Sequence, residues 1–130
     1  MSNSSKQAGT RWETEVVNYL RQWWPMVDRR PLAGRYDKGD IKYAASGWTI
    51  ECKNHAKLNF PMFLRQARTE AANNGDPWYV AVVKNRKAKF SSGATADAFA
   101  VMPLRVWAEL AHELEDLRAR HSTGMVGSPK

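Results

Sequence analysis

The chain has 130 residues, of which 43% are hydrophobic and 25% charged, which suffices for one compact domain and excludes two. Twenty Lys and Arg against thirteen Asp and Glu give a net charge of +7, so an anionic partner is favoured, with nucleic acid first. A single cysteine excludes a disulfide within the chain and a cysteine-based structural zinc site. Since no apolar run is long enough to cross a bilayer, we expect a cytoplasmic protein that makes no membrane contact.

The two ends of the chain differ in composition from its middle. Residues 1–9 and 122–130 are rich in small and polar residues, and we expect both to be disordered tails. A single domain is expected over residues 10–121, where helix-like and strand-like apolar patterns alternate, as is typical of the α/β class. The expected elements are a helix over 10–24, strands over 26–31, 40–44 and 48–54, a helix over 61–74, strands over 78–83 and 98–102, and a helix over 103–121.

Local signals set the ends of these helices. Pro25 ends the apolar pattern of the first helix, while Pro61 and Gly75 suit the start and the end of the second. The run over 78–83 is typical of a buried central strand. The third helix carries apolar residues that we expect to face the core. These are Leu104, Trp107, Leu110, Ala111, Leu114 and Leu117.

The strands over 40–44 and 48–54 are close enough in sequence to form a hairpin, and they carry the clearest chemical signal. Strand alternation sends Glu51 and Lys53 to one face of the strand. The opposite face carries Trp48, Ile50 and Cys52. Asp40 lies opposite Glu51 or opposite Lys53, depending on the turn, and both registers gather the three on one face. Opposed carboxylates repel each other, and a divalent cation that prefers oxygen ligands, Mg²⁺ or Mn²⁺, removes that repulsion.

The alternative for this cluster is a solvated sheet face on which Glu and Lys merely alternate. Three features favour a functional site instead: Gly39 directly before Asp40, apolar residues on the opposite face, and the surplus of positive charge elsewhere. The cluster is therefore a candidate metal site.

Glu13 lies within the apolar arc of the first helix, whereas Glu15 lies outside it. A carboxylate on the core-facing side of a helix is costly without a partner, so we expect Glu13 to point into a polar site against the sheet. Thr10 and Glu13 also match a capping box, in which the glutamate only satisfies a backbone amide at the helix start. The two interpretations are compatible.

Four groups of residues follow one another along the chain: Gly9, Glu13, Gly39-Asp40 and Glu51-Cys52-Lys53. Their order and their placement on the first helix and the two strands resemble the signature of the PD-(D/E)XK nucleases, as arranged in Holliday junction resolvases of the archaeal Hjc type and related phage enzymes. The resemblance covers about residues 9–102. It implies a restriction-endonuclease-like core, a central mixed β-sheet flanked by helices in the order α-β-β-β-α-β-β-α.

The resemblance also implies a role for each matched residue. Asp40 and Glu51 would bind the divalent metal, Mg²⁺ or Mn²⁺, with the backbone carbonyl of Cys52 as a further ligand. Lys53 would position the attacking water or stabilise charge at the phosphate, and Glu13 would complete the metal site directly or through water. Such a set supports hydrolysis of a phosphodiester bond.

Basic residues flank the candidate site, and we expect them to bind DNA phosphates through their charge. They are Arg29, Arg30, Arg35, Lys38, Lys57, Arg65, Arg68, Lys84, Arg86, Lys87 and Lys89. Gln66 stands at the edge of the apolar arc of its helix and could reach the site, as a glutamine does in related nucleases; a surface glutamine is the alternative.

The sequence thus predicts an Mg²⁺-dependent, structure-selective endodeoxyribonuclease, with a Holliday junction resolvase as the first interpretation. A homodimer is expected with it, because two symmetric cuts in a four-way junction require two sites. Two alternatives stay open: a nuclease of the same fold that cuts single-stranded, flap or other branched DNA, and a non-catalytic basic DNA-binding module. Three carboxylates where phosphate must approach argue against the module, because they repel it.

Overall fold

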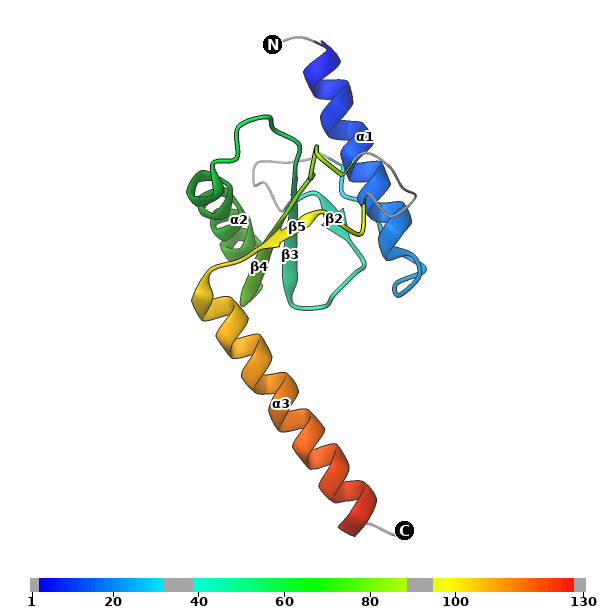
Figure 1. The fold of residues 1–130 in the computed structure, drawn as a ribbon, viewed down its shortest axis with the longest axis vertical. Coiled ribbons are helices and arrows are strands. Elements are labelled where there is room, and N and C mark those ends of the chain that lie inside the picture. The colour runs from blue at the N-terminus through cyan, green and yellow to red at the C-terminus, as the bar shows by residue number, and fades with distance from the viewer. Residues whose placement is uncertain (1–2, 32–38, 89–94, 128–130) are drawn as a thin grey trace.

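The computed structural model describes residues 3–31, 39–88 and 95–127. Its helices and strands follow the order expected from the sequence and belong to the α/β class (Figure 1). They are α1 (Asn3–Leu20), β1 (Asp28–Arg29), β2 (Ile41–Lys42), β3 (Trp48–Lys53), α2 (Phe60–Asn74), β4 (Trp78–Val83), β5 (Phe99–Val101) and α3 (Leu104–Gly127). Within these residues, none of the helices combines the length and the apolar character needed to cross a membrane.

A mixed sheet of three strands forms the centre of the domain, in the order β3-β4-β5. β3 and β4 are parallel, from Trp48 opposite Trp78 to Lys53 opposite Val83, and β5 is antiparallel to β4. Parallel neighbours need a crossover connection, and α2 supplies it. The prediction of β4 as a buried central strand over 78–83 is confirmed.

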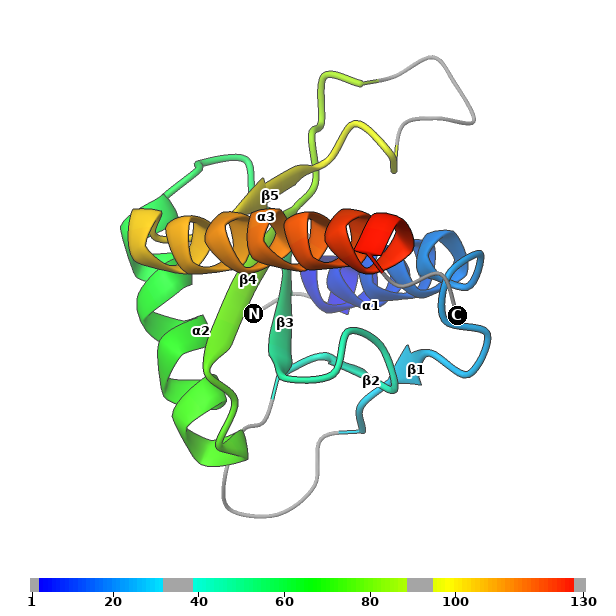
Figure 2. The same cartoon turned by 90° about the horizontal axis from the view of Figure 1, so that it is seen from below.

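The two helices that precede and follow β3 cover opposite faces of this sheet (Figure 2). Trp12 and Val16 of α1 pack with Ile50 and Cys52 on one face. On the other face, Phe63 and Ala67 of α2 are fully buried, in clusters with β4 residues. α2 keeps its expected bounds because Pro61 lies in its first turn and Gly75 ends it in the left-handed conformation.

The predicted hairpin of residues 40–44 with 48–54 is wrong. β2 pairs antiparallel with β1 in a separate two-stranded sheet, and β3 pairs with β4. The physical reason lies in the connection, where the positive φ of Tyr43 ends the extended backbone of β2 at Lys42, and positive φ at Ala45 and Gly47 keeps the chain irregular up to the start of β3. One backbone bond, 3.1 Å from the Asp40 N–H to the Ile50 carbonyl, still holds the start of β2 beside β3.

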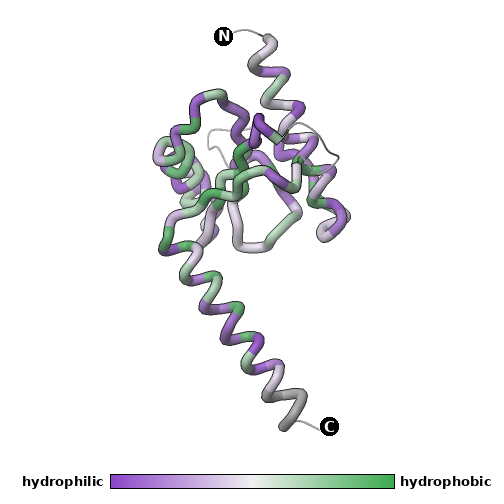
Figure 3. Tube along the Cα trace, in the orientation of Figure 1, coloured by the Kyte–Doolittle hydropathy of each residue, from purple (hydrophilic) through white to green (hydrophobic). Residues whose placement is uncertain are grey.

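The expected burial of α3 is also wrong. Leu110 and Ala111 are partly buried, but Leu104, Trp107, Leu114 and Leu117 are exposed. Among residues 104–122, whose side chains the structure describes, only Val106 is fully buried. A helix of 24 residues is about 36 Å long, while six-residue strands reach about 20 Å, so the sheet is too small to cover it. α3 therefore projects from the domain, with apolar and polar segments recurring along it (Figure 3).

Both outer helices extend into the segments expected to be disordered tails. α1 begins at Asn3 and not at Thr10, and α3 continues to Gly127 and not to His121. The composition of residues 1–9 predicted that they do not pack against the core, and Lys6 and Gln7 are exposed. They are nevertheless helical, because a helix can extend beyond its packed turns at little further cost once it has formed. At its other end α1 stops at Leu20, four residues earlier than expected, in a turn before Pro25.

Candidate active site

Asp40 and Glu51 come together from two different segments of the chain. The Asp40 Oδ2 atom accepts a 2.8 Å hydrogen bond from the backbone N–H of Cys52, and the Asp40 carbonyl accepts one of 2.7 Å from the N–H of Arg30. These bonds fix Asp40 beside the middle of β3, near enough to Glu51 for the two carboxyl groups to hydrogen-bond. Of the two partners that the sequence left open for Asp40, Glu51 and Lys53, the structure places Asp40 against Glu51, although the hairpin itself does not form.

Gly39 makes the approach of Asp40 to β3 possible. Its φ is +91°, and a Cβ at this position would lie 3.0 Å from the Cγ2 of Thr49 and 3.3 Å from the carbonyl oxygen of Ile50. No L side chain adopts such a conformation cheaply, so only glycine allows the chain to pass this close to the strand. The Gly-Asp pair noted in the sequence is thus explained by backbone geometry.

Burial and a neighbouring carboxyl group shift each of these two acids towards its neutral form. The pKa of Asp40 rises from 3.8 to about 8, chiefly because burial strips water from the charged group and also because Glu51 is close. The pKa of Glu51 rises from 4.5 to about 8, again chiefly by burial, with Glu70 as the next cause. Two neighbouring acids whose ionised forms are disfavoured by burial gain from a cation that compensates their charge, so the position favours a cation.

Glu70 is a site residue that the sequence reasoning missed. It is 1% exposed on α2 and lies within hydrogen-bond reach of Glu51. The signal was present, because Glu70 falls at helical spacing with Phe63, Ala67 and Ala71, the buried face of α2. The argument used for Glu13, that a carboxylate on an apolar helix face needs a polar partner, applies equally to Glu70.

Lys53, Gln66 and Glu70 form a hydrogen-bonded chain that returns to Glu51. The Nζ of Lys53 donates to the Oε1 of Gln66, and the Nε2 of Gln66 donates to the Oε2 of Glu70 at 3.1 Å. The same Nζ lies 3.2 Å from the Oε2 of Glu51, so the ammonium group is held between a carboxylate and an amide. Gln66 thus contacts the site, as the sequence reasoning allowed, and α2 orients Lys53.

Glu13 lies near the site but is held by another partner. Its Oε1 is 3.0 Å from the Nε of Arg29, and it is close enough to Asp40 to contribute to the raised pKa of that residue. The capping-box interpretation is wrong, because α1 begins at Asn3 and Thr10 lies in its interior. Glu13 is anchored to the sheet by its neighbour Trp12, whose indole N–H donates to the Val82 carbonyl at 3.1 Å.

The expected DNA-binding residues fall into four groups. Lys57, Arg65, Arg68 and Lys87 are exposed. Others are engaged within the domain: Arg29 with Glu13, Lys84 with Glu15 at 3.2 Å, and Arg86 with the side chain and carbonyl of Asn54. Arg30 is half-buried, and its Nε has no hydrogen-bond partner among the described residues. Arg35, Lys38 and Lys89 lie outside the described residues.

The basic loop after β4 begins directly beside the candidate site. The N–H of Lys84 donates to the carbonyl of Lys53 at 2.9 Å, so the end of β4 is bonded to the end of β3. This bond places Lys84 beside Lys53, and Arg86 bonds to Asn54, the residue after Lys53. The expectation that basic residues border the carboxylates is met here.

The donor set suits a small divalent cation. Mg²⁺ is usually held by one or two protein carboxylates, with water and substrate phosphate as the other ligands, and Asp40 and Glu51 supply two. The Oε1 of Glu51 is buried and has no hydrogen-bond donor within the described residues, so one ligand atom is available. No three His, Cys, Asp or Glu side chains in that part of the chain are grouped as a ready-made metal site. The case for a bound cation therefore depends on the two carboxyl groups of Asp40 and Glu51, without Glu13 as a third direct ligand.

No protein-family model, curated protein or solved structure matches this chain. The functional argument rests on the geometry and chemistry of the site.

Proposed function

We propose that this chain is a metal-dependent endodeoxyribonuclease that hydrolyses phosphodiester bonds in branched DNA, with the four-way Holliday junction as its first substrate. The proposal includes a restriction-endonuclease-like core and a homodimer that carries two sites. The observation that carries it is the pair of carboxyl groups of the half-buried Asp40 and the buried Glu51, each with a pKa raised to about 8, beside the ammonium group of Lys53. A bound cation would compensate the charge of the two carboxylates, and an anionic substrate would pair with the ammonium group.

The chain's own residues divide the work of binding and orientation. Asp40 and Glu51 would hold Mg²⁺ or Mn²⁺, with the Cys52 carbonyl as a further ligand from the same strand. When bound, such an ion polarises the scissile phosphate and makes water a stronger nucleophile at neutral pH. Lys53, held by Gln66 and Glu51, directs its positive charge to the place where negative charge develops on the phosphate.

A purely structural role for this cluster accounts less well for the same features. Buried carboxylates without compensation lower stability, and a DNA-binding surface gains nothing from acidic groups that repel phosphate. The net charge of +7 and the exposed basic residues of α2 and the β4–β5 connection then supply the attraction for DNA. Carboxylates surrounded by basic residues are the arrangement expected of a phosphodiesterase that needs a metal.

The test is a cleavage assay on three labelled substrates: a four-way junction, a flap and a linear duplex. We expect cutting of the junction with Mg²⁺ or Mn²⁺ and none with EDTA. Asp40→Asn removes one buried carboxylate and should abolish cutting, while Glu115→Gln, on the exposed surface of α3, serves as the matched control. Cleavage confined to the flap would keep the active site and change the substrate. Binding to all three without any cutting would identify a DNA-binding module and end the proposal.

A further inference from the structure

α3 carries an apolar stripe that nothing in the described part of the chain covers. Trp107, Leu114 and Leu117 are 55%, 46% and 51% exposed, and Leu110 is partly buried. Their spacing of three, four and three residues places them at the first and fourth positions of two successive heptads. We call Trp107, Leu110, Leu114 and Leu117 the α3 seam. Such a spacing is typical of a helix that packs along another helix.

Only the beginning of α3 is attached to the domain. Val106 is fully buried in a cluster with Tyr79, Ala67 and Ala71, and Glu109 accepts a 3.0 Å hydrogen bond from the Trp78 indole. Beyond these anchors the helix leaves the sheet and projects away from it (Figure 1). The rigid first turns fix the direction of the seam, so the helix presents it to a partner in a defined orientation.

We propose that the α3 seam binds the α3 seam of a second copy of this chain, with the two helices parallel. In a parallel pair of helices, the residue that precedes the first position of a heptad lies near the residue five positions further along the partner helix. Leu114 is the first position of the second heptad, so Glu113 of one copy lies near Arg118 of the other. The two-fold symmetry of the pair forms this contact twice. Antiparallel pairing of Trp107 with Leu117 would instead bring the two Glu113 residues together, and like charges oppose association. The charges beside the seam therefore select both the partner and its direction.

The seam alone is too small for a stable dimer, and the surface beside it supplies the rest. Three side chains about half exposed and the partly buried Leu110 offer at most about 500 Å² per copy, against roughly 800 Å² in a typical stable interface. Leu110 also lines an apolar groove of about 510 Å³, whose walls include Leu20, Trp24 and Trp48. A partner helix about 10 Å from α3 on the seam side reaches this groove as well.

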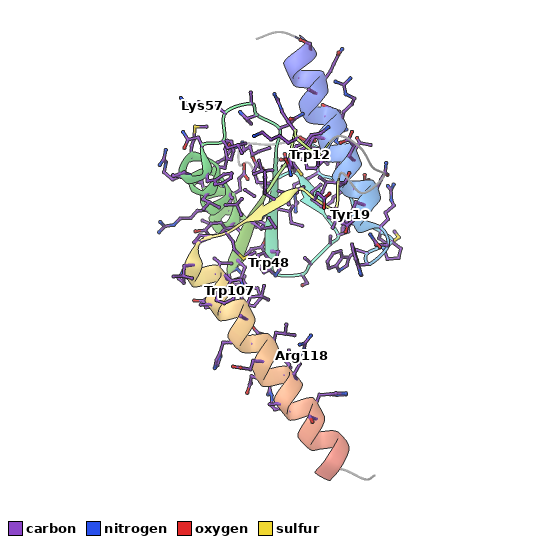
Figure 4. The ribbon with its side chains drawn as sticks, viewed as in Figure 1. Trp12, Tyr19, Trp48, Lys57, Trp107 and Arg118 are labelled. Atoms are coloured by element: carbon purple, nitrogen blue, oxygen red, sulfur yellow. The ribbon has the colours of Figure 1, made fainter. Side chains whose placement is uncertain are left out.

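Pairing through α3 leaves the candidate active site open. β3 starts at Trp48, which packs against the cluster that holds Val106 of α3, and ends at Lys53. From there the chain continues to Lys57, which Figure 4 places at the end of the domain away from α3. Arg118 lies further out along the projecting helix (Figure 4). The interface deepens the proposed homodimer by naming its contact surface. Its test uses no DNA, so failure of the seam leaves the proposed cleavage of DNA open, and failure of cleavage leaves the seam open.

The first experiment measures the mass of the full chain in solution by sedimentation or light scattering. We expect twice the chain mass of 14.8 kDa at micromolar concentration. Leu114→Arg with Leu117→Arg should give the monomer, because charged groups would then occupy the seam. Ala119→Arg, on the far side of the helix, is the matched control and should leave the dimer intact. Circular dichroism checks that each variant is folded. A wild-type monomer at 100 µM, or a dimer that survives both seam substitutions, overturns the proposal.

A charge exchange tests the direction of pairing. Glu113→Arg and Arg118→Glu, each alone, should raise the dissociation constant about tenfold, because each sets like charges against each other across the interface. The two together should restore it to within about threefold of wild type. Residues five apart do not face each other on one helix, so restoration reports contact between copies. Failure of the double variant to recover would rule out the parallel arrangement.

Discussion

Asp40 and Cys52 are joined by a 2.8 Å hydrogen bond from the backbone N–H of Cys52 to the Oδ2 of Asp40. The bond uses one carboxylate oxygen to fix the position of the other beside Glu51. A backbone donor on β3 therefore determines where the acidic residue of another segment lies, and substitutions at Asp40 test both the chemistry and this attachment.

Asp40→Asn and Glu51→Gln should each lower the cleavage rate by on the order of 100-fold or more, because each removes a ligand of the cation and a source of negative charge at the reaction centre. DNA binding should remain or become tighter, since a repulsive charge is lost. Single-turnover cleavage and fluorescence anisotropy with EDTA measure the two quantities separately. A parallel loss of binding and folding would show that the carboxylates are structural.

The stability of the metal-free protein should fall as pH rises between about 4 and about 8. Burial raises the pKa of Asp40 from 3.8 and of Glu51 from 4.5, both to about 8, so the folded state favours their protonated forms. Their contribution to stability is present below about pH 4 and is lost as pH rises through about 8. Added Mg²⁺ should raise the unfolding temperature most near pH 8, because ionised carboxylates bind the cation.

Differential scanning calorimetry at several pH values measures this dependence. The double variant Asp40→Asn with Glu51→Gln is the reference, because it keeps every other titrating group of the chain. The unfolding temperature of the wild type should fall further below that of the reference as pH rises, and added Mg²⁺ should reduce this gap. An unchanged difference across this range would contradict the raised pKa values.

Gln66→Ala should lower the cleavage rate by about 10- to 100-fold while leaving DNA affinity near wild type. Gln66 holds the ammonium group of Lys53 and bonds to Glu70, so its loss frees Lys53 to move away from the phosphate. Thr69→Ala, one turn away on the exposed side of α2, is the control. Equal rates for the two variants in a single-turnover assay would remove Gln66 from the site.

Gly39→Ala should destabilise the protein by about 1–3 kcal/mol and also lower activity. The added Cβ meets the Thr49 side chain at 3.0 Å in a backbone conformation that alanine disfavours, which pushes Asp40 away from β3. Gly9→Ala is the opposite case: a Cβ there meets nothing within 4 Å, and the position lies inside α1, so about 0.5–1 kcal/mol of stabilisation is expected. Chemical denaturation of both variants tests the contrast.

Much of the fold was predictable because its signals are local. Pro61 and Gly75 bound α2 in sequence and in space, and β4 occupies the residues of its apolar run. The partner of β3 was not predictable in this way, because positive φ at Tyr43 and Ala45, residues that rarely adopt it, breaks the hairpin that the spacing favours. The prediction that α3 packs on the core was wrong for a related reason. Periodicity shows that a helix has an apolar face, but it does not show what covers that face.

The site was predictable in part for the same reason. Alternation along β3 places Glu51 and Lys53 on the face of α2, and the Gly39-Asp40 pair marks the close approach. Glu70 was missed because glutamate is common on exposed helix faces, and its significance depends on knowing which face of α2 is buried. The ion pair of Glu13 with Arg29 depends on the contact between α1 and β1, which no spacing in the sequence encodes.

The crossover from β3 through α2 to β4 has a consequence for how the chain folds. It is continuous in sequence, so its contacts close short loops, and we expect it to form early. It already contains Glu51, Lys53, Gln66 and Glu70, whereas Asp40 arrives from the preceding segment. Half-folded chains therefore carry the lysine and its support without the full cation-binding pair, and only complete folding brings Asp40 beside Glu51.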